Sequence, residues 1–112
     1  MKAMKKPCPN GKCPYEEAIR LVGNVWSLQI IKELHLQKKP VRFNEFLRAL
    51  KPISSKTLSA KLKELTKCGV IKKEVLAETP VLIQYSLTGK GQELTPILDD
   101  MAQWTLRWRS NE

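Results

Sequence analysis

The chain has 112 residues, which suits one domain built around one hydrophobic core. It carries a formal net charge of +9, and 42% of its residues are hydrophobic, as in ordinary globular proteins. No stretch approaches the ~18 consecutive apolar residues that cross a bilayer, and no apolar run follows the basic start as in a signal peptide. We therefore expect a soluble cytoplasmic protein that does not contact a membrane.

The positive charge is concentrated in one stretch. Residues 51–73 contain seven lysines and a single acid, Glu64, for a net charge of +6. Clustering of this kind is typical of a surface that binds a polyanion. A membrane-binding helix would place its leucine anchors beside the lysines, but here the leucines fall on the opposite side. The pattern favours double-stranded DNA as the partner.

Cysteine and histidine are scarce. The odd count of three cysteines, Cys8, Cys13 and Cys68, argues against a disulfide scaffold. The Cys8-x4-Cys13 spacing has no second pair that would complete a tetrahedral zinc site. His35, the single histidine, has no acid or thiol four residues away, and no glycine loop is suited to cradling phosphate. We expect no metal, no cofactor and no enzymatic activity.

The first half of the chain predicts a basic arm and three short helices. Residues 1–14 hold three prolines and four lysines without periodicity, and we expect a flexible arm ahead of a domain spanning residues 15–112. Helices are predicted over residues 15–22, 25–36 and 43–50 from their apolar spacing. Trp26 lies on the apolar stripe of the second helix, and we interpret it as a core anchor.

Residues 54–69 predict an amphipathic helix with clear ends. Ser54 or Ser55 can cap its start, and Gly69 follows its last periodic residue. Leucines at positions 58, 62 and 65 share one face. The opposite face carries Lys56, Ser59, Ala60, Lys63 and Lys67. Such a face suits a DNA groove, with ammonium groups for phosphates and short polar groups for base edges; a merely solvated lysine-rich helix is the alternative.

Alternating apolar residues then predict two strands, residues 70–76 and 81–88, joined by a four-residue loop. A hairpin that directly follows a basic helix-turn-helix is a wing. Lys72 and Lys73 lie on its first strand, whereas its tip carries the acidic Glu78. The predicted fold is mainly helical with a small β-hairpin, a winged helix-turn-helix.

The chain ends in a long predicted helix, residues 92–108, after a break at residues 89–91. Its apolar residues recur every three or four positions: Leu94, Ile97, Leu98, Met101, Trp104 and Trp108. We interpret this stripe as a dimerisation surface to which Tyr15 and Ile19 of the first helix contribute. The alternative is that the helix folds back and completes the monomer core.

Several short motifs, in order, resemble the HxlR family of winged-helix transcription regulators, which is similar in fold to the MarR group. The motifs are Cys13-Pro14, Leu21-Val22-Gly23-x-x-Trp26, Arg42-Phe43-Asn44-Glu45, Ile53-Ser54-x-Lys56-x-Leu58, Leu62-Lys63-Glu64-Leu65 with Gly69, and Tyr85-Ser86-Leu87-Thr88 with Gly91. The resemblance covers nearly the whole chain. It implies a homodimeric, sequence-specific regulator of transcription that binds a pseudo-palindromic operator.

Carried onto this chain, the resemblance makes residues 54–67 the recognition helix, with half-sites ~34 Å apart. Arg42 and Lys63 would hold phosphates, and Ser55, Lys56 and Ser59 would lie nearest to base edges. The full set of expected DNA contacts is Arg42, Asn44, Ser54, Ser55, Lys56, Ser59, Lys63, Lys67, Lys72 and Lys73.

The resemblance also implies that Cys13 occupies a position at which some family members sense oxidants or electrophiles. A thiol at a helix start, beside Lys12, has its thiolate favoured by the dipole and the charge. Cys8 is the candidate resolving thiol. The alternative is that Cys13 is an ordinary buried cysteine, and an oxidant or a small molecule remains a possible effector.

The wing departs from the family pattern. An arginine is common near position 82 in the family, but here Val81 and Leu82 are apolar and Glu78 is acidic. A basic residue is also usual at the position of Val25. The apolar wing supports a second hypothesis, a winged-helix protein-interaction module that does not read DNA sequence.

Overall fold

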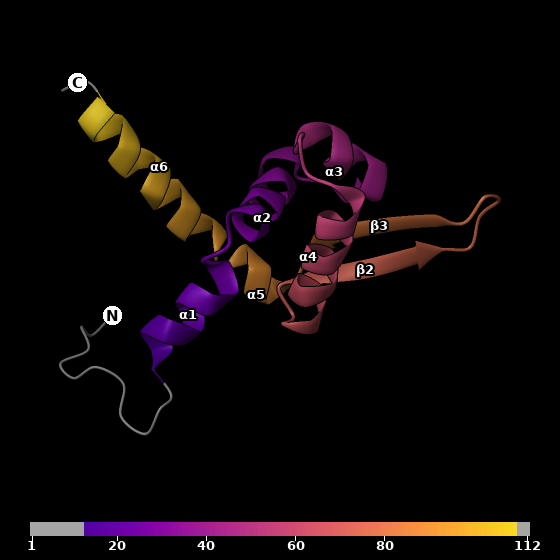
Figure 1. Ribbon diagram of the computed structural model, residues 1–112, viewed down its shortest axis with the longest axis horizontal. Coiled ribbons are helices and arrows are strands. Elements are labelled where there is room, and N and C mark those ends of the chain that lie inside the picture. Colours follow the sequence, from indigo (N-terminus) through magenta and orange to yellow (C-terminus); the bar gives the residue numbers. More distant parts are fainter. Residues whose placement is uncertain (1–12, 110–112) are drawn as a thin grey trace.

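The computed structural model describes residues 13–109, and Cys8 lies outside these residues (Figure 1). The elements are α1 (Pro14–Val22), α2 (Val25–Gln37), β1 (Val41–Arg42), α3 (Phe43–Ala49), α4 (Ser55–Lys67), β2 (Ile71–Leu76), β3 (Leu82–Leu87), α5 (Gly89–Gln92) and α6 (Thr95–Arg109). The mainly helical fold with a β-hairpin wing is the architecture expected from the sequence.

The three strands form one antiparallel sheet in the order β1-β3-β2. Tyr85 of β3 lies between Val41 of β1 and Lys73 of β2. The β2–β3 hairpin extends well beyond the helices and ends in an exposed tip (Figure 1). The sheet therefore has a buried inner part and a projecting outer part, the wing.

The core lies between α2, α3, α4 and the inner part of the sheet. Phe46 of α3 is fully buried and meets the ring of Tyr85 edge-on, with ring centroids 6.3 Å apart. Trp26 packs against this core, as the sequence predicted. Ridges of α2 and α4 side chains complete the packing, which fixes α4 firmly to the rest of the domain.

Polar side chains define the helix boundaries. The side chain of Asn24 accepts the backbone N–H of Trp26 at 2.9 Å and so caps α2. Thr88 caps α5 by accepting the N–H of Gly91 at 3.1 Å, and its hydroxyl donates to the carbonyl of Val70. Gly69 has a φ of +77°, a conformation that favours glycine, where the chain turns from α4 into β2.

Two features of local structure differ from the sequence expectation. The two-residue strand β1 was not foreseen, because it is too short to show alternation and forms only by pairing with β3. The break expected at residues 89–91 is instead the short helix α5, and the long helix expected from residue 92 begins only at Thr95. Pro96 lies in the first turn of α6; in a continuous helix its ring would clash with the carbonyl four residues earlier, so the helix restarts at Thr95.

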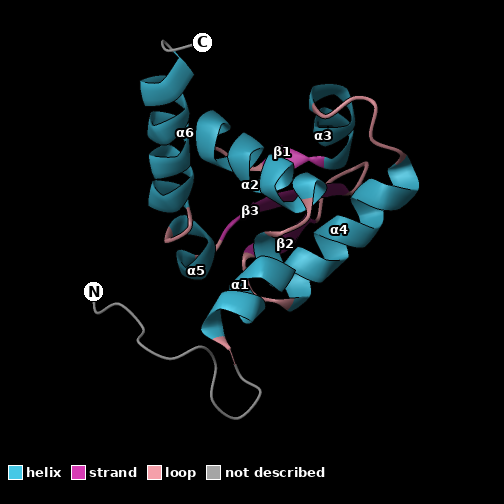
Figure 2. Ribbon diagram, turned by 60° about the vertical axis from the view of Figure 1, so that its left-hand side comes forward, coloured by secondary structure: helices cyan, strands magenta, loops and turns pink. Residues whose placement is uncertain are grey.

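Helices α1 and α6 project from the end of the molecule opposite the wing (Figure 1). Figure 2 shows α6 standing alongside α2. A contact between His35 of α2 and Asp99 of α6, whose Nε2 and Oδ1 lie 3.1 Å apart, joins these two helices. In residues 13–109 no helix has both the length and the apolar character needed to cross a membrane.

Candidate nucleic-acid interface

Helix α4 is held by its apolar face and presents its basic face to solvent. Leu58, Leu62 and Leu65 are at most 1% exposed. The opposite side carries the exposed residues Lys56, Ser59, Ala60, Lys63 and Lys67, the face expected from the sequence. Because three leucines fix the rotation of α4 about its axis, the direction in which the lysines point is fixed too.

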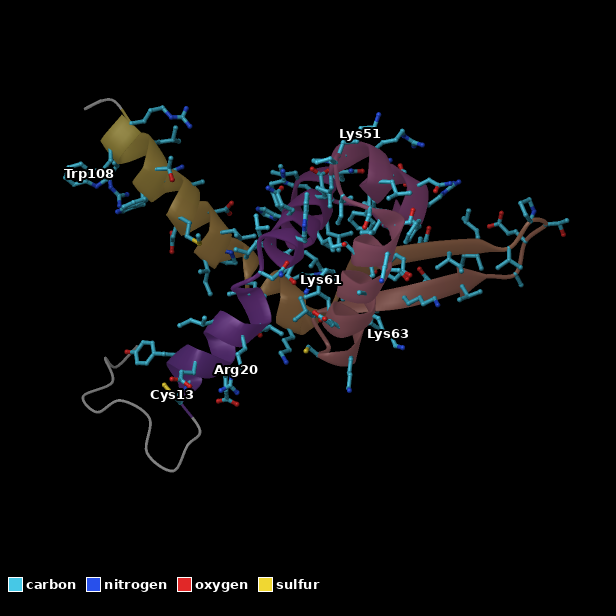
Figure 3. All side chains as sticks on the ribbon, viewed as in Figure 1. Cys13, Arg20, Lys51, Lys61, Lys63 and Trp108 are labelled. Atoms are coloured by element: carbon cyan, nitrogen blue, oxygen red, sulfur yellow. The ribbon has the colours of Figure 1, made fainter. Side chains whose placement is uncertain are left out.

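The lysines of α4 differ in their surroundings (Figure 3). Lys61 is only 20% exposed, and its Nζ lies 3.3 Å from the carboxylate of Glu64. Lys63 is exposed and forms no ion pair within residues 13–109. Lys63 is therefore available to an external anion, whereas the charge of Lys61 is already paired.

The wing and α4 enclose a groove of about 470 Å³. Its lining residues are Ser59, Leu62, Lys63, Thr66, Lys67, Lys73 and Tyr85. Lys73 and Tyr85 are cross-strand partners and share one face of the sheet. Lys72 pairs with Ser86 on the other face, so of the two wing lysines only Lys73 joins α4.

Tyr85 was not singled out from the sequence as a site residue, although it shares the apolar face of its strand with Ile83 and Leu87 and alternates with the polar Gln84 and Ser86. Burial raises the pKa of its hydroxyl above the ordinary value of 10.0. The phenol is neutral at physiological pH, and its largely buried side chain forms part of the groove lining. The groove combines cations and hydroxyl groups, the groups that contact phosphates and base edges.

Arg42 and Asn44 lie at a second groove, between α3 and β3, and do not line the first. The backbone N–H of Arg42 donates to the Glu45 carboxylate at 2.9 Å, which leaves its exposed side chain uncommitted to the cap. The structure thus separates the expected DNA contacts into a central set on α4 and a flanking set at the start of α3.

Two expected DNA contacts, Ser54 and Ser55, lie at the start of α4. Ser54 Oγ accepts the N–H of Thr57 and donates to its hydroxyl, both at 3.0 Å. Ser54 is therefore the cap, and one of the two alternatives left open by the sequence is settled. Ser55 is the first helical residue and is exposed, so its hydroxyl is available to a partner.

The expected dimer residues are largely uncovered. Six are at least half exposed in the single chain: Tyr15, Ile19, Ile97, Met101, Trp104 and Trp108. Leu94 and Leu98 pack against the core, so these two complete the monomer instead. Leu94 lies just before α6, and within α6 the side that carries Leu98 packs inside the chain while the side that carries Met101, Trp104 and Trp108 is exposed.

The cysteines differ in environment. Cys13 precedes the first residue of α1, is 5% exposed and is disulfide-bonded. Cys68 is an exposed free thiol at the end of α4. Among the described residues no group of His, Cys, Asp and Glu side chains is placed to hold a metal ion.

A capped basic helix on a leucine-backed face, preceded by a short helix and followed by a hairpin, defines a winged helix-turn-helix protein. Residues 21–112 match the model of the family described as HxlR-like helix-turn-helix. The chain belongs to this family of transcriptional regulators, which are not enzymes.

Individual relatives agree with this assignment. YdzF of Bacillus subtilis strain 168, an uncharacterized HTH-type transcriptional regulator, is 37% identical over 101 residues, covering 90% of this chain and 92% of YdzF. The reduced form of the transcriptional regulator YodB of B. subtilis is similar in structure, with a TM-score of 0.74 and 38% identity over 84% of this chain and 91% of YodB. The redox regulator HypR in its oxidized form has a TM-score of 0.77 and 32% identity, covering 85% of this chain and 96% of HypR.

The capping role of Ser54 can be tested by a serine pair. Ser54→Ala removes the acceptor for the N–H of Thr57, and we expect the free energy of unfolding to fall by about 1 kcal/mol. Ser55→Ala removes a neighbouring hydroxyl that has no hydrogen bond within the described residues, and we expect a change within about 0.5 kcal/mol. Urea unfolding followed by circular dichroism measures both, and equal losses would contradict the assignment.

Proposed function

We propose that the protein is a sequence-specific DNA-binding regulator that binds a pseudo-palindromic operator as a homodimer. The main observation that supports this proposal is the exposed face of α4, whose lysines and serines are held in one direction by the buried leucines behind them. A rigid helix with cations and short polar groups on its outer face fits the major groove of B-form DNA.

The position of each side chain along α4 suggests its role. Ser55, Lys56 and Ser59 occupy the N-terminal half, the part of a recognition helix that contacts base edges. Lys63 and Lys67, further along, then lie over the phosphate backbone together with Lys73 of the wing. Arg42 and Asn44 extend the phosphate contacts from the start of α3. Lys72 lies on the other face of the wing, and we do not assign it to this interface.

The proposed homodimer is supported by helices α1 and α6, which we call the dimer arms to distinguish them from the basic arm of residues 1–14. Both project from the end opposite the wing (Figure 1), and both leave large apolar side chains exposed. Trp104 and Trp108 are each 59% exposed, an unfavourable state for tryptophan in a free monomer. Pairing of these arms would bury the tryptophans and place two α4 helices about one turn of DNA apart, ~34 Å.

We further propose that the dimeric unit comprises residues 15–112, that residues 1–14 form a basic arm, and that the protein acts in the cytoplasm. The arm lies mainly outside the described residues. Its four lysines support a role along the phosphate backbone beside the operator.

Control by thiol oxidation is the proposed mode of regulation. Cys13 lies at the start of α1, within the proposed dimer arm, so a change at its sulfur would alter the arm that spaces the two recognition helices. The structure has Cys13 in the disulfide-bonded state, for which we propose Cys8 as the partner. In the reduced protein, a peroxide would oxidise the thiols of Cys13 and Cys8 to this one disulfide and would itself be reduced to water with their two electrons and two protons. The similarity to the redox regulator HypR supports this assignment.

A second candidate function is a protein-interaction module that does not read DNA sequence. The apolar wing favours it, because Val75, Val81 and Ile83 are exposed on a projecting hairpin. The uncovered cationic face of α4 is the stronger signal, since nothing in the described part of the chain neutralises it.

The DNA interface can be tested by a lysine pair on one helix. Lys63→Gln removes a free cation, and we expect weaker binding together with a slope of log affinity against log salt that is smaller by about one. Lys61→Gln removes a lysine already paired with Glu64, and we expect the slope of the unmodified protein. Fluorescence anisotropy on a duplex fragment over a salt series gives both slopes, and identical slopes for the two variants would reject the assigned face.

The dimer can be tested by placing a charge on each of two equally exposed apolar positions. Trp104→Glu would bury a carboxylate in the proposed interface, and we expect dimerisation to weaken by about 30-fold or more. Val75→Glu changes a wing residue that is 58% exposed, against 59% for Trp104, and should leave the dimer intact. Sedimentation velocity measures the populations. A monomeric parent protein, or a dimer indifferent to Trp104→Glu, would refute the proposal.

The thiol switch can be tested with the two described cysteines. Each protein is first reduced with dithiothreitol and freed of it, because Cys13 is disulfide-bonded in the structure. The unmodified protein and Cys68→Ser should then both change their DNA affinity after peroxide treatment, whereas Cys13→Ser should bind DNA and ignore the oxidant. Anisotropy before and after treatment, and again after reduction with dithiothreitol, measures the response. An unchanged oxidant response in Cys13→Ser would exclude Cys13 as the sensor.

A further inference from the structure

The outer edge of β3 is only partly covered. On the inner side, β2 pairs with β3 along the whole length of β3, from Leu82 to Leu87. On the other side, β1 pairs only with Tyr85 and Gln84, because the chain turns into α3 after Arg42. In residues 13–109 no strand therefore lies beside the outer edge of Leu82 and Ile83. An uncovered strand edge is a template for pairing with another chain.

This uncovered edge forms one wall of a groove of about 740 Å³, and α3 forms the other. Val81, Ile83 and Phe43 give the groove an apolar floor. Val81 is 62% exposed and Ile83 is 37% exposed, so this floor is accessible. Ile83 lies two residues from Tyr85 and shares its face of the sheet, so the floor continues the core-facing side of the sheet outward.

The rim of the groove is cationic. Lys39, Arg42 and Arg48 line it, and Glu45 is the only acid among the lining residues. Glu45 already accepts the N–H of Arg42 and lies 3.9 Å from Lys39 Nζ. The guanidinium of Arg48 forms no ion pair within the described residues and is exposed. The groove thus combines an open strand edge, an apolar floor and unneutralised positive charge.

We propose that this groove binds an extended acidic peptide segment of another protein, which adds to the sheet as a strand beside β3. Such a segment continues the line of β1 past Arg42 for about three residues, or ~10 Å. Alternate side chains then point in opposite directions: apolar ones pack on Ile83 and Phe43, and acidic ones reach the arginines. Backbone hydrogen bonds to β3 hold the segment, and the two side-chain rows select it.

The other occupants fit the groove less well. A DNA backbone would leave Val81 and Ile83 against phosphate, which gains nothing from an apolar floor. A second copy of this chain pairing edge to edge would bring two sets of Lys39, Arg42 and Arg48 together, and like charges repel. An acidic, partly apolar strand is complementary to both the floor and the rim.

Arg42 belongs both to this groove and to the proposed DNA contacts, so a bound peptide would compete with DNA. This consequence rests on the proposed function. The peptide assay below contains no DNA, so failure of the groove and failure of the DNA interface are separate results.

The probe is a fluorescein-labelled peptide of sequence EVEIEVE, with binding to the full chain followed by anisotropy. We expect saturable binding that is at least about 10-fold weaker in Arg48→Glu and in Val81→Asp. Both positions are exposed, so folding is preserved, and circular dichroism verifies it. Lys51→Glu, an exposed charge change outside the groove, and Val75→Asp, an exposed apolar change on β2, serve as matched controls and should bind normally.

Two further peptides test how the segment binds. A version with N-methyl groups along one edge keeps every side chain but cannot donate hydrogen bonds from those nitrogens, and it should bind at least about 10-fold more weakly. The peptide KVKIKVK should not bind. Absence of EVEIEVE binding, equal binding of the N-methylated or lysine peptide, or equal losses in the matched controls would overturn the proposal. If Val81→Asp and Arg48→Glu weaken the binding of a short DNA duplex but not the binding of the peptide, the groove binds DNA and the peptide proposal is rejected.

Discussion

Burial of three leucines of α4 against the domain core is the interaction on which the interface depends. Leu58, Leu62 and Leu65 are almost completely excluded from water, and together they are worth several kcal/mol of burial at about 1.5–3 kcal/mol each. The charged face contributes little to stability, since exposed lysines interact weakly through water. Packing therefore sets the orientation of α4, and that orientation directs its lysines toward solvent, where they can contact an anionic partner.

The part of the fold that could be predicted from the sequence is the part encoded locally. The start of α4 at Ser54 or Ser55, its end before Gly69 and its leucine stripe all follow from spacing and capping within sixteen residues, and the structure decides that Ser54 is the cap. The basic face followed at once, because a helix with a known buried side has a known exposed side. The sequence proposed Lys72 and Lys73 alike, and only the observed register of the hairpin places Lys73, and not Lys72, on the face with Tyr85 beside α4.

The features that escaped prediction depend on residues distant in sequence. The strand β1 has two residues and exists only because Val41 and Arg42 pair with β3, more than forty positions later. His35 has no acid four residues away on its own helix, yet Asp99 lies beside it across the α2–α6 contact. The division of α6 into a covered and an exposed side likewise depends on how the helix packs, which spacing alone does not determine.

The small contact between α6 and the rest of the domain also bears on how the protein could be regulated. Helix α6 and Leu94, which directly precedes it, join the α2–α4 half of the domain through Leu94, Leu98 and the His35–Asp99 contact, a small junction compared with the core beneath α4. Because α4 is rigidly packed and the junction is modest, a change at the arms moves one half against the other more readily than it deforms either half. A homodimer joined through these arms would convert that movement into a change in the spacing of its two α4 helices. Cys13 lies at the start of α1 and the β3 groove lies beside α3, so the two proposed sites would act by different routes. Oxidation at Cys13 would change the spacing of the two α4 helices in the proposed dimer. A peptide in the groove would instead cover Arg42, a proposed DNA contact.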